Sequence, residues 1–313
     1  MRRALFVVLT LIHGLPASAA SVSLRPMRFT AHSGRVKPGE ERLVCHRLKI
    51  GHPQTVEVGR VRMVMPPGGH HVDLYRPSAS PPAWPPKNCP TTINFSDWEL
   101  VAATQEHVFD WQLPPGVAIN FSAHQPLLVQ THFLSAGAAT RAGTAAARVE
   151  LYPVDPASVT THGGALFAED RAIVVPPGRT TLTSRCMVTT QSGSPRDLTI
   201  MGFTGHYHFR GIAFIVNRVQ PDGTLGEVLY QHDGLSVPPF RQYPSDQPLI
   251  LHAGEGLEWR CTYQNNTHAT FLFGSDTSRQ EHCNLFGFYY PTASPQEAIA
   301  CVHEPGDEPA AGD

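Results

Sequence analysis

The stretch "TGHYHFRGIAFIVNRV" (residues 204–219) joins an H-x-H pair to a run rich in β-branched and aromatic residues. That run predicts a β-strand over 211–219, and we expect the preceding "TGHYHFRG" to be extended as well. Alternate residues of a strand face the same side, so His206 and His208 would point at one place, where copper or zinc could bind. The pair alone does not decide, because 17 histidines in 313 residues give about one H-x-H by chance. Two exposed surface histidines remain the alternative.

Short segments of the same kind recur along the chain and are separated by turn residues. The expected strands lie at residues 54–65, 126–134, 146–154, 171–177 and 211–219. The 29 prolines and 26 glycines fit many turns, and no segment sustains an amphipathic helical pattern for long. This spacing predicts an all-β protein of the β-sandwich type.

The strand pattern breaks at "PVDPASVTTHGG" (153–164), which divides residues 20–302 into two parts of similar length. We therefore expect one β domain over residues 20–155 and a second over 160–302. Residues 303–313 are acidic and rich in proline and glycine, which predicts a disordered tail.

The first residues, "MRRALFVVLTLIHGLPASAA", have the basic, apolar, small-residue order of a signal peptide. We expect a signal peptide over residues 1–19, cleavage near Ala19, and a secreted, extracytoplasmic protein with no membrane span. The net charge of −2 provides no basic surface of the kind that nucleic acids need, so neither nucleic acid nor an acidic membrane is an expected partner. Oligomeric state is left open.

Export changes the interpretation of the cysteines. An even number in an oxidising compartment predicts three disulfides, although six cysteines allow 15 pairings and the spacing does not choose among them. The six are Cys45, Cys89, Cys186, Cys261, Cys283 and Cys301.

Four other histidines stand in contexts that suit metal binding. His70 and His71 are adjacent, and both can meet one metal only at a strand end or a bulge, for which the preceding Gly68-Gly69 supplies the freedom. His132 lies within an apolar strand, where a core histidine bonded to a carbonyl is the alternative. His282 precedes Cys283, and a disulfide there would fix the backbone beside it.

Taken in order, the motifs resemble the copper type II, ascorbate-dependent monooxygenase family over roughly residues 40–301. They are "GGHHVDLY" (68–75), "LLVQTHF" (127–133), "TGHYHFRG" (204–211) and "EHCNLFGFYYP" (281–291). The resemblance implies two tandem antiparallel β-sandwiches, jelly-roll-like, facing each other across a cleft, with one of two separate copper ions in each. It assigns an electron-transfer copper to His70, His71 and His132, and an oxygen-binding copper to His206, His208 and the position of His282.

The family has methionine where this chain has His282. Imidazole should stabilise Cu(II) more than a thioether does, which lowers the reduction potential and slows reduction by ascorbate. Asn284 retains a substrate-contacting position, whereas Thr204 replaces an arginine that anchors substrate carboxylates. The resemblance also implies the disulfides Cys45–Cys89, Cys186–Cys301 and Cys261–Cys283.

The leading hypothesis is a secreted copper monooxygenase that hydroxylates a C–H bond of a small-molecule substrate with O₂ and electrons from ascorbate or a similar reductant. A second hypothesis is a non-catalytic copper-binding or scavenging protein on the same fold, supported by the His282 substitution. A third is a metal-free β-sandwich recognition module.

Overall fold

The computed structural model describes residues 25–37, 39–66, 68–78, 84, 97–134, 143–191, 193–234 and 237–306. The predicted all-β class is confirmed. Within these residues the regular elements are strands, apart from two three-residue 3₁₀ helices, η1 (Pro156–Ser158) and η2 (Val188–Thr190). The strands form five sheets of three to six strands each.

Two sheets are built from the strands that precede Gly163, and together they are called the N-lobe here. The six-stranded sheet has the order β1 (Met27–Val36), β9 (Gly143–Pro153), β3 (Val56–Val64), β7 (Val117–Phe121), β10 (Thr161–His162), with β6 (Val108–Gln112) also on β3. The four-stranded sheet has the order β2 (Glu41–Lys49), β8 (Pro126–Leu134), β4 (Gly69–Pro77), β5 (Trp98–Thr104).

Three sheets are built from the strands after Gly163, and together they are called the C-lobe. The largest has the order β17 (Arg241–Gln242), β14 (Leu198–His206), β22 (Asn284–Tyr290), β11 (Gly164–Asp170), β23 (Ile299–His303), with β18 (Leu249–Leu251) also on β14. A four-stranded sheet has the order β13 (Gly178–Cys186), β19 (Gly256–Asn265), β15 (Gly211–Val219), β16 (Leu225–Asp233). The smallest has the order β12 (Val174–Val175), β20 (Phe271–Phe273), β21 (Gln280–Glu281).

The expected strands correspond to β3, β8, β9, β12 and β15, and the segments 126–134 and 211–219 match their strands residue for residue. The exception is 171–177, which yields only the two-residue β12. Pro176 and Pro177 have no N–H to donate to a neighbouring strand, so they end the pairing there.

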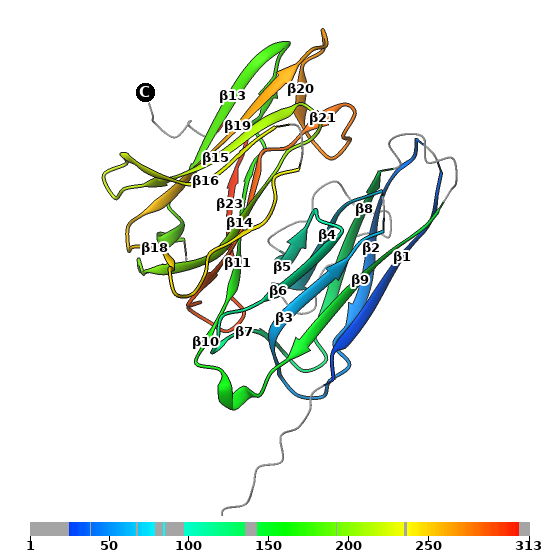
Figure 1. Cartoon of the computed structure of the whole chain (residues 1–313), viewed down its shortest axis with the longest axis vertical. Coiled ribbons are helices and arrows are strands. Elements are labelled where there is room, and N and C mark those ends of the chain that lie inside the picture. The colour runs from blue at the N-terminus through cyan, green and yellow to red at the C-terminus, as the bar shows by residue number, and fades with distance from the viewer. Residues whose placement is uncertain are drawn as a thin grey trace, which may run out of the picture.

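The two lobes pack directly against each other, and β5 of the N-lobe lies beside β11 of the C-lobe (Figure 1). Trp111 in β6 is almost fully buried, and its ring centroid lies 4.4 Å from that of Phe288 in β22. Phe240 of the C-lobe packs on Trp111 and on Phe109 of the same strand. The apolar core of the N-lobe therefore continues into the C-lobe. Two tandem jelly-roll sandwiches across a cleft remain a prediction, since the five small sheets do not divide clearly in that way.

Two of the implied disulfides are present in the structure, Cys186–Cys301 and Cys261–Cys283. The third, Cys45–Cys89, involves Cys89, which lies outside the described residues, as does the expected signal peptide. The expected tail begins at His303, but His303 is the last residue of β23 and its Nδ1 lies 3.0 Å from Asp170 Oδ1. Among the described residues, no helix is long and apolar enough to cross a bilayer.

Replacing Trp111 tests the contact between the lobes. Trp111→Ala removes the largest buried ring at this contact and should lower the free energy of unfolding by about 3–5 kcal/mol, measured by urea denaturation. Phe209→Ala, at a ring that is 57% exposed, is the matched control and should change stability by less than about 0.5 kcal/mol. Equal effects of the two substitutions would contradict a core shared between the lobes.

Candidate metal centre

The register of two N-lobe strands sets His71 opposite His132. The two residues are cross-strand partners on β4 and β8, and their ring centroids lie 4.9 Å apart. His71 Nε2 lies 3.1 Å from His132 Nδ1, while His132 Nε2 lies 2.7 Å from the carboxylate of Glu41 on β2. A carboxylate accepts, so His132 carries its proton on Nε2 and its Nδ1 lone pair faces His71. The alternative interpretation of His132, a core histidine bonded to a carbonyl, is therefore not what the structure shows.

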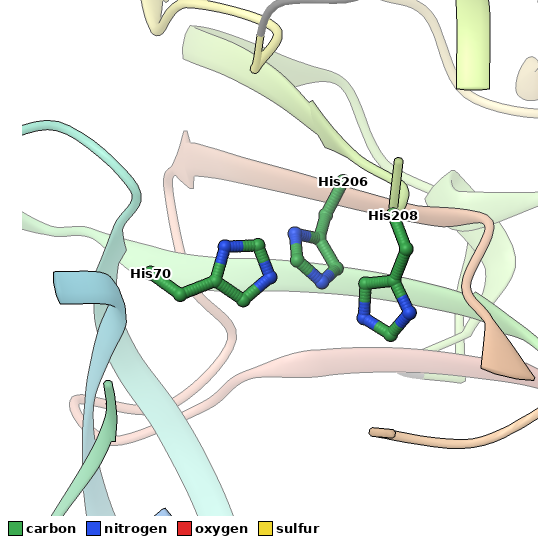
Figure 2. Close-up of side chains that lie close together, drawn as sticks. All are labelled: His70, His206 and His208. Carbon is green, nitrogen blue, oxygen red and sulfur yellow. The ribbon is translucent and has the colours of Figure 1, made fainter. Parts of the chain in front are cut away.

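A bulge turns His70 away from that pair. The register between β4 and β8 shifts between Gly69 and His71, so that His70 is the extra residue, as the Gly68-Gly69 pair predicted. Gly68 has a φ of 89°, a value that favours glycine. The His70 ring remains 5.4 Å from that of His71 and 5.0 Å from that of His132. Figure 2 shows that the ring also projects toward His206 and His208.

The H-x-H pair lies where β14 ends. His206 is the last residue of the strand, whereas His208 lies beyond it, so the expected strand over both histidines is shorter than predicted. The reason is local, because the His208 N–H bonds to the Glu281 carboxylate (2.9 Å) and the Gly211 N–H closes a turn onto the His208 carbonyl (3.0 Å). Both histidines are nevertheless about 4% exposed, and their ring centroids lie 5.4 Å apart.

Hydrogen bonds fix the tautomer of both rings. His208 Nδ1 lies 2.9 Å from the Gln280 carbonyl, which can only accept, so the proton is on Nδ1 and Nε2 is left with its lone pair. His206 Nδ1 lies 2.6 Å from Gln105 Oε1, and Gln105 Nε2 donates to the Gly205 carbonyl (2.7 Å), which fixes the orientation of the amide. His206 therefore also presents an unprotonated Nε2.

His282 lies in the short link between β21 and β22, with its ring 5.3 Å from that of His206 and 4.7 Å from that of His208. Its carbonyl accepts from the buried Tyr263 hydroxyl, and the Cys283 carbonyl accepts from Trp259 Nε1 (3.1 Å). With the Cys261–Cys283 disulfide, these contacts hold the backbone beside His282, as expected. The ring differs from the other two, because its Nδ1 lies 3.3 Å from the Asn284 amide nitrogen, a donor.

The two predicted sets of histidines form one cluster that spans the lobes. The His70 ring centroid lies 5.1 Å from that of His206 and 5.7 Å from that of His208, and the centroids of His71 and His206 lie 5.6 Å apart. One ligand atom from each of His70, His206 and His208 lies within 4.8 Å of the other two. The resemblance implied two separate sites, whereas these centroid distances between the sets, 5.1–5.7 Å, are close to those within each set, 4.7–5.4 Å.

Burial favours the neutral form of four histidines of this cluster. Desolvation lowers the pKa of His208 to about 4 and lowers those of His70, His206 and His282 well below the usual value. Neighbouring imidazoles lower the last three further, since a second positive charge nearby is unfavourable. The buried His70 Nε2 has no hydrogen-bond partner. Neutral imidazoles with unprotonated nitrogens, one of them unsatisfied, form a donor set that suits copper or zinc.

Carboxylates support the cluster from both lobes, and the sequence analysis did not predict this role for them. Glu41 contacts His132, Asp73 Oδ2 lies 3.0 Å from His71 Nδ1, and the buried Glu281 holds both the His208 backbone and Arg210. Two of these had a signal in the sequence: Asp73 lies two residues after His71 in a strand, and Glu281 precedes His282 in the motif. Gln105 had none, because no pattern marks the residue after β5.

A cavity between the lobes opens beside the cluster. Its walls include His71, Asp73 and Gln130 from the N-lobe, and His206, Phe286 and Asn284 from the C-lobe. Glu169 also lines it, and burial raises the pKa of this carboxyl to about 7. The described lining contains no lysine or arginine. Thr204, which stands where the resemblance places a carboxylate-anchoring arginine, donates to the Pro238 carbonyl (2.8 Å).

Fold and site together define an all-β protein with a buried imidazole centre of the kind that binds transition metals. Residues 161–308 match the sequence model described as copper type II ascorbate-dependent monooxygenase, C-terminal domain. Over these residues the C-lobe is therefore similar to the C-terminal domain of the copper type II, ascorbate-dependent monooxygenases. The match includes His206, His208 and His282, and it begins after the N-lobe histidines His70, His71 and His132.

No curated protein matches the chain as a whole. Among solved structures, PNGase F, a glycosylasparaginase from Flavobacterium meningosepticum, is 8% identical, with a TM-score of 0.38 over 88% of this chain and 98% of that one. The cowpea mosaic virus top component is 8% identical, with a TM-score of 0.37 over 93% of this chain and 100% of that one. Similarities at this level carry no argument about function.

The stability of the metal-free protein should fall as the pH falls. Because the pKa of His208 is near 4 in the folded chain and about 6.5 when unfolded, the unfolded chain takes up the proton first. This histidine alone should cost about 1.4 kcal/mol of unfolding free energy per pH unit between those values. Urea denaturation at pH 7, 6 and 5 measures the slope.

Comparison with His208→Gln isolates this contribution, because Glu169, with its raised pKa, acts in the opposite direction as the pH falls. The variant should lose less stability than the wild type over the same range. Parallel stability curves for the two proteins would show that His208 is not buried in its neutral form.

Proposed function

We propose that this chain is a secreted copper-dependent monooxygenase, which inserts one oxygen atom of O₂ into a substrate C–H bond. The other oxygen atom leaves as water, with two electrons from ascorbate or a similar reductant and two protons. The observation that carries this proposal is the His206–His208 pair. Both rings present an unprotonated Nε2, in the lobe that matches the family and beside a cavity between the lobes.

In this proposal copper is held by His206, His208 and His282 on one side, and by His70, His71 and His132 on the other. Bound copper would supply the one-electron redox chemistry and the activation of O₂ that no side chain provides. Gln105 and the Gln280 carbonyl hold the two C-lobe rings in the tautomer that leaves Nε2 free. Such supporting hydrogen bonds orient ligands and raise their basicity.

The cavity suits a substrate without a carboxylate. Phe286 and Phe167 form an aromatic wall, with ring centroids 4.8 Å apart, and Asn284 keeps a buried Oδ1 with no hydrogen-bond partner. The carboxyl groups of Asp73 and Glu169 also line the cavity and would repel an anionic substrate. Glu169 can hold a proton near neutral pH, since its pKa is about 7. A neutral or aromatic small molecule is therefore the proposed substrate class.

A second candidate function is copper binding without turnover, and the observation that favours it is His282. Imidazole in place of a thioether favours Cu(II) and slows reduction. Secretion is part of either proposal, and the Cys186–Cys301 and Cys261–Cys283 disulfides support an oxidising compartment.

Oxygen uptake separates the two functions. Copper-loaded, desalted protein should consume O₂ with ascorbate, and His208→Ala should lower that rate at least about tenfold because it removes a ligand. His282→Met should raise the rate, since a thioether favours the reduced metal. Tight copper binding with no uptake in either protein would favour the copper-binding function. Less than about one copper per chain would favour a metal-free module.

Gln105 should matter for copper affinity although it does not contact the metal in this proposal. Gln105→Leu removes the acceptor that holds the His206 proton on Nδ1, and should weaken Cu(II) binding by about 10–100-fold in a chelator competition. Gln247→Leu, at an exposed glutamine of the C-lobe, is the matched control and should bind copper as the wild type does. Unchanged affinity in Gln105→Leu would rule out this supporting role.

A further inference from the structure

The three histidines whose ligand nitrogens lie closest together are not three that the family resemblance groups together. His206 and His208 each have Nε2 available, and the third available nitrogen is Nε2 of His70, across the lobe boundary. One nitrogen of each lies within 4.8 Å of the other two, and Figure 2 shows His70 reaching toward the pair.

We propose that His70, His206 and His208 form one copper site that joins the two lobes, with His70 as the third ligand in place of His282. This inference rests on the proposed function and deepens it, because it moves His70 from the N-lobe set to the proposed oxygen-binding site and leaves His282 outside that site. It makes that site incomplete in either lobe alone.

The partners of His282 argue against its being the third ligand. The Asn284 amide nitrogen lies 3.3 Å from His282 Nδ1 and also 3.5 Å from Glu169 Oε1, so the amide donates toward both. A ring that accepts at Nδ1 carries its proton on Nε2, and that nitrogen then has no lone pair for a metal. His282 is thus held in the opposite tautomer from His206 and His208.

The partners of His70 argue for it. His132 bonds to Glu41 through Nε2, and its Nδ1 lies 3.1 Å from His71 Nε2, so both rings have a close polar neighbour within the N-lobe. The bulge at His70 removes its ring from that arrangement and leaves its buried Nε2 without a partner. A buried nitrogen in this state is costly unless something binds it, and copper shared with His206 and His208 would do so.

Contacts between the lobes keep the three rings at this distance. Gln105 of the N-lobe bonds to both His206 and the Gly205 carbonyl, and the neighbouring Glu106 accepts from the Phe240 N–H (3.0 Å). On the other side of the cluster, Glu41 accepts from the Thr277 N–H (3.4 Å). The close approach of His70 to the C-lobe therefore has its own supporting hydrogen bonds.

The test uses the full chain in a background, His71→Gln with His132→Gln, in which the N-lobe set of three histidines cannot form. One equivalent of Cu(II) is added, and its affinity is measured by competition with a chelator. In this background, further His70→Ala should weaken binding at least about tenfold, and further His282→Ala should change it less than about threefold. His268→Ala and His107→Ala, at exposed histidines of the two lobes, are the matched controls.

The opposite pattern, in which His282→Ala releases copper and His70→Ala has no effect, would overturn the inference while leaving the proposed copper site of the C-lobe intact. Loss of all copper binding in the wild-type chain would instead remove the proposed function. If the background variant does not fold, a second measurement replaces the competition assay. Single variants of the otherwise native chain are given one equivalent of Cu(II), and their electron paramagnetic resonance spectra are compared with that of the wild type. The spectrum should change in both His70→Ala and His208→Ala and stay the same in His132→Ala and His282→Ala. A spectrum that changes in His132→Ala, or in His282→Ala but not in His70→Ala, would overturn the inference.

Discussion

The arrangement of the centre depends on one electrostatic constraint, which is that imidazoles packed this closely and this deeply cannot be charged together. Desolvation and mutual repulsion both favour the neutral ring, as the lowered pKa values of His70, His206 and His282 show. Neutral imidazole has one donor and one acceptor nitrogen, so a hydrogen-bond partner sets which nitrogen of each ring carries the proton. An amide sets the tautomer of His206, a backbone carbonyl that of His208, and a carboxylate that of His132.

The same constraint explains why backbone elements of very different kinds meet at this place. A strand end supplies His206, a turn supplies His208, a bulge supplies His70, and a disulfide-anchored link supplies His282. Each is a position where the backbone departs from regular pairing and can aim a ring off the sheet axis. Regular pairing between β4 and β8 supplies His71 and His132, and these four interruptions of the strands supply the other histidines.

Much of this was visible in the sequence for identifiable reasons. Periodic apolar residues predicted β8 and β15 to the residue, and the Gly68-Gly69 pair predicted the bulge beside His70. Motif order predicted six metal-ligating histidines in two sets of three, and the structure brings the rings of all six together. Their union in one cluster was not predictable, because it depends on how Trp111, Phe240 and Phe288 pack between the lobes. Such contacts carry no local pattern, and neither does the amide of Gln105.

The hydrogen bonds of Gln105 carry a consequence for motion. The amide belongs to one lobe and the ring that it orients belongs to the other, so any separation of the lobes breaks the bond between Gln105 Oε1 and His206 Nδ1. Water would then replace a fixed acceptor, and the ring would be free to exchange its two tautomers or to rotate about χ2. A separation of the lobes that opens the cavity would therefore also release the constraint on which His206 nitrogen is unprotonated. Access to the cavity and the choice of the metal-binding nitrogen of His206 are thus coupled.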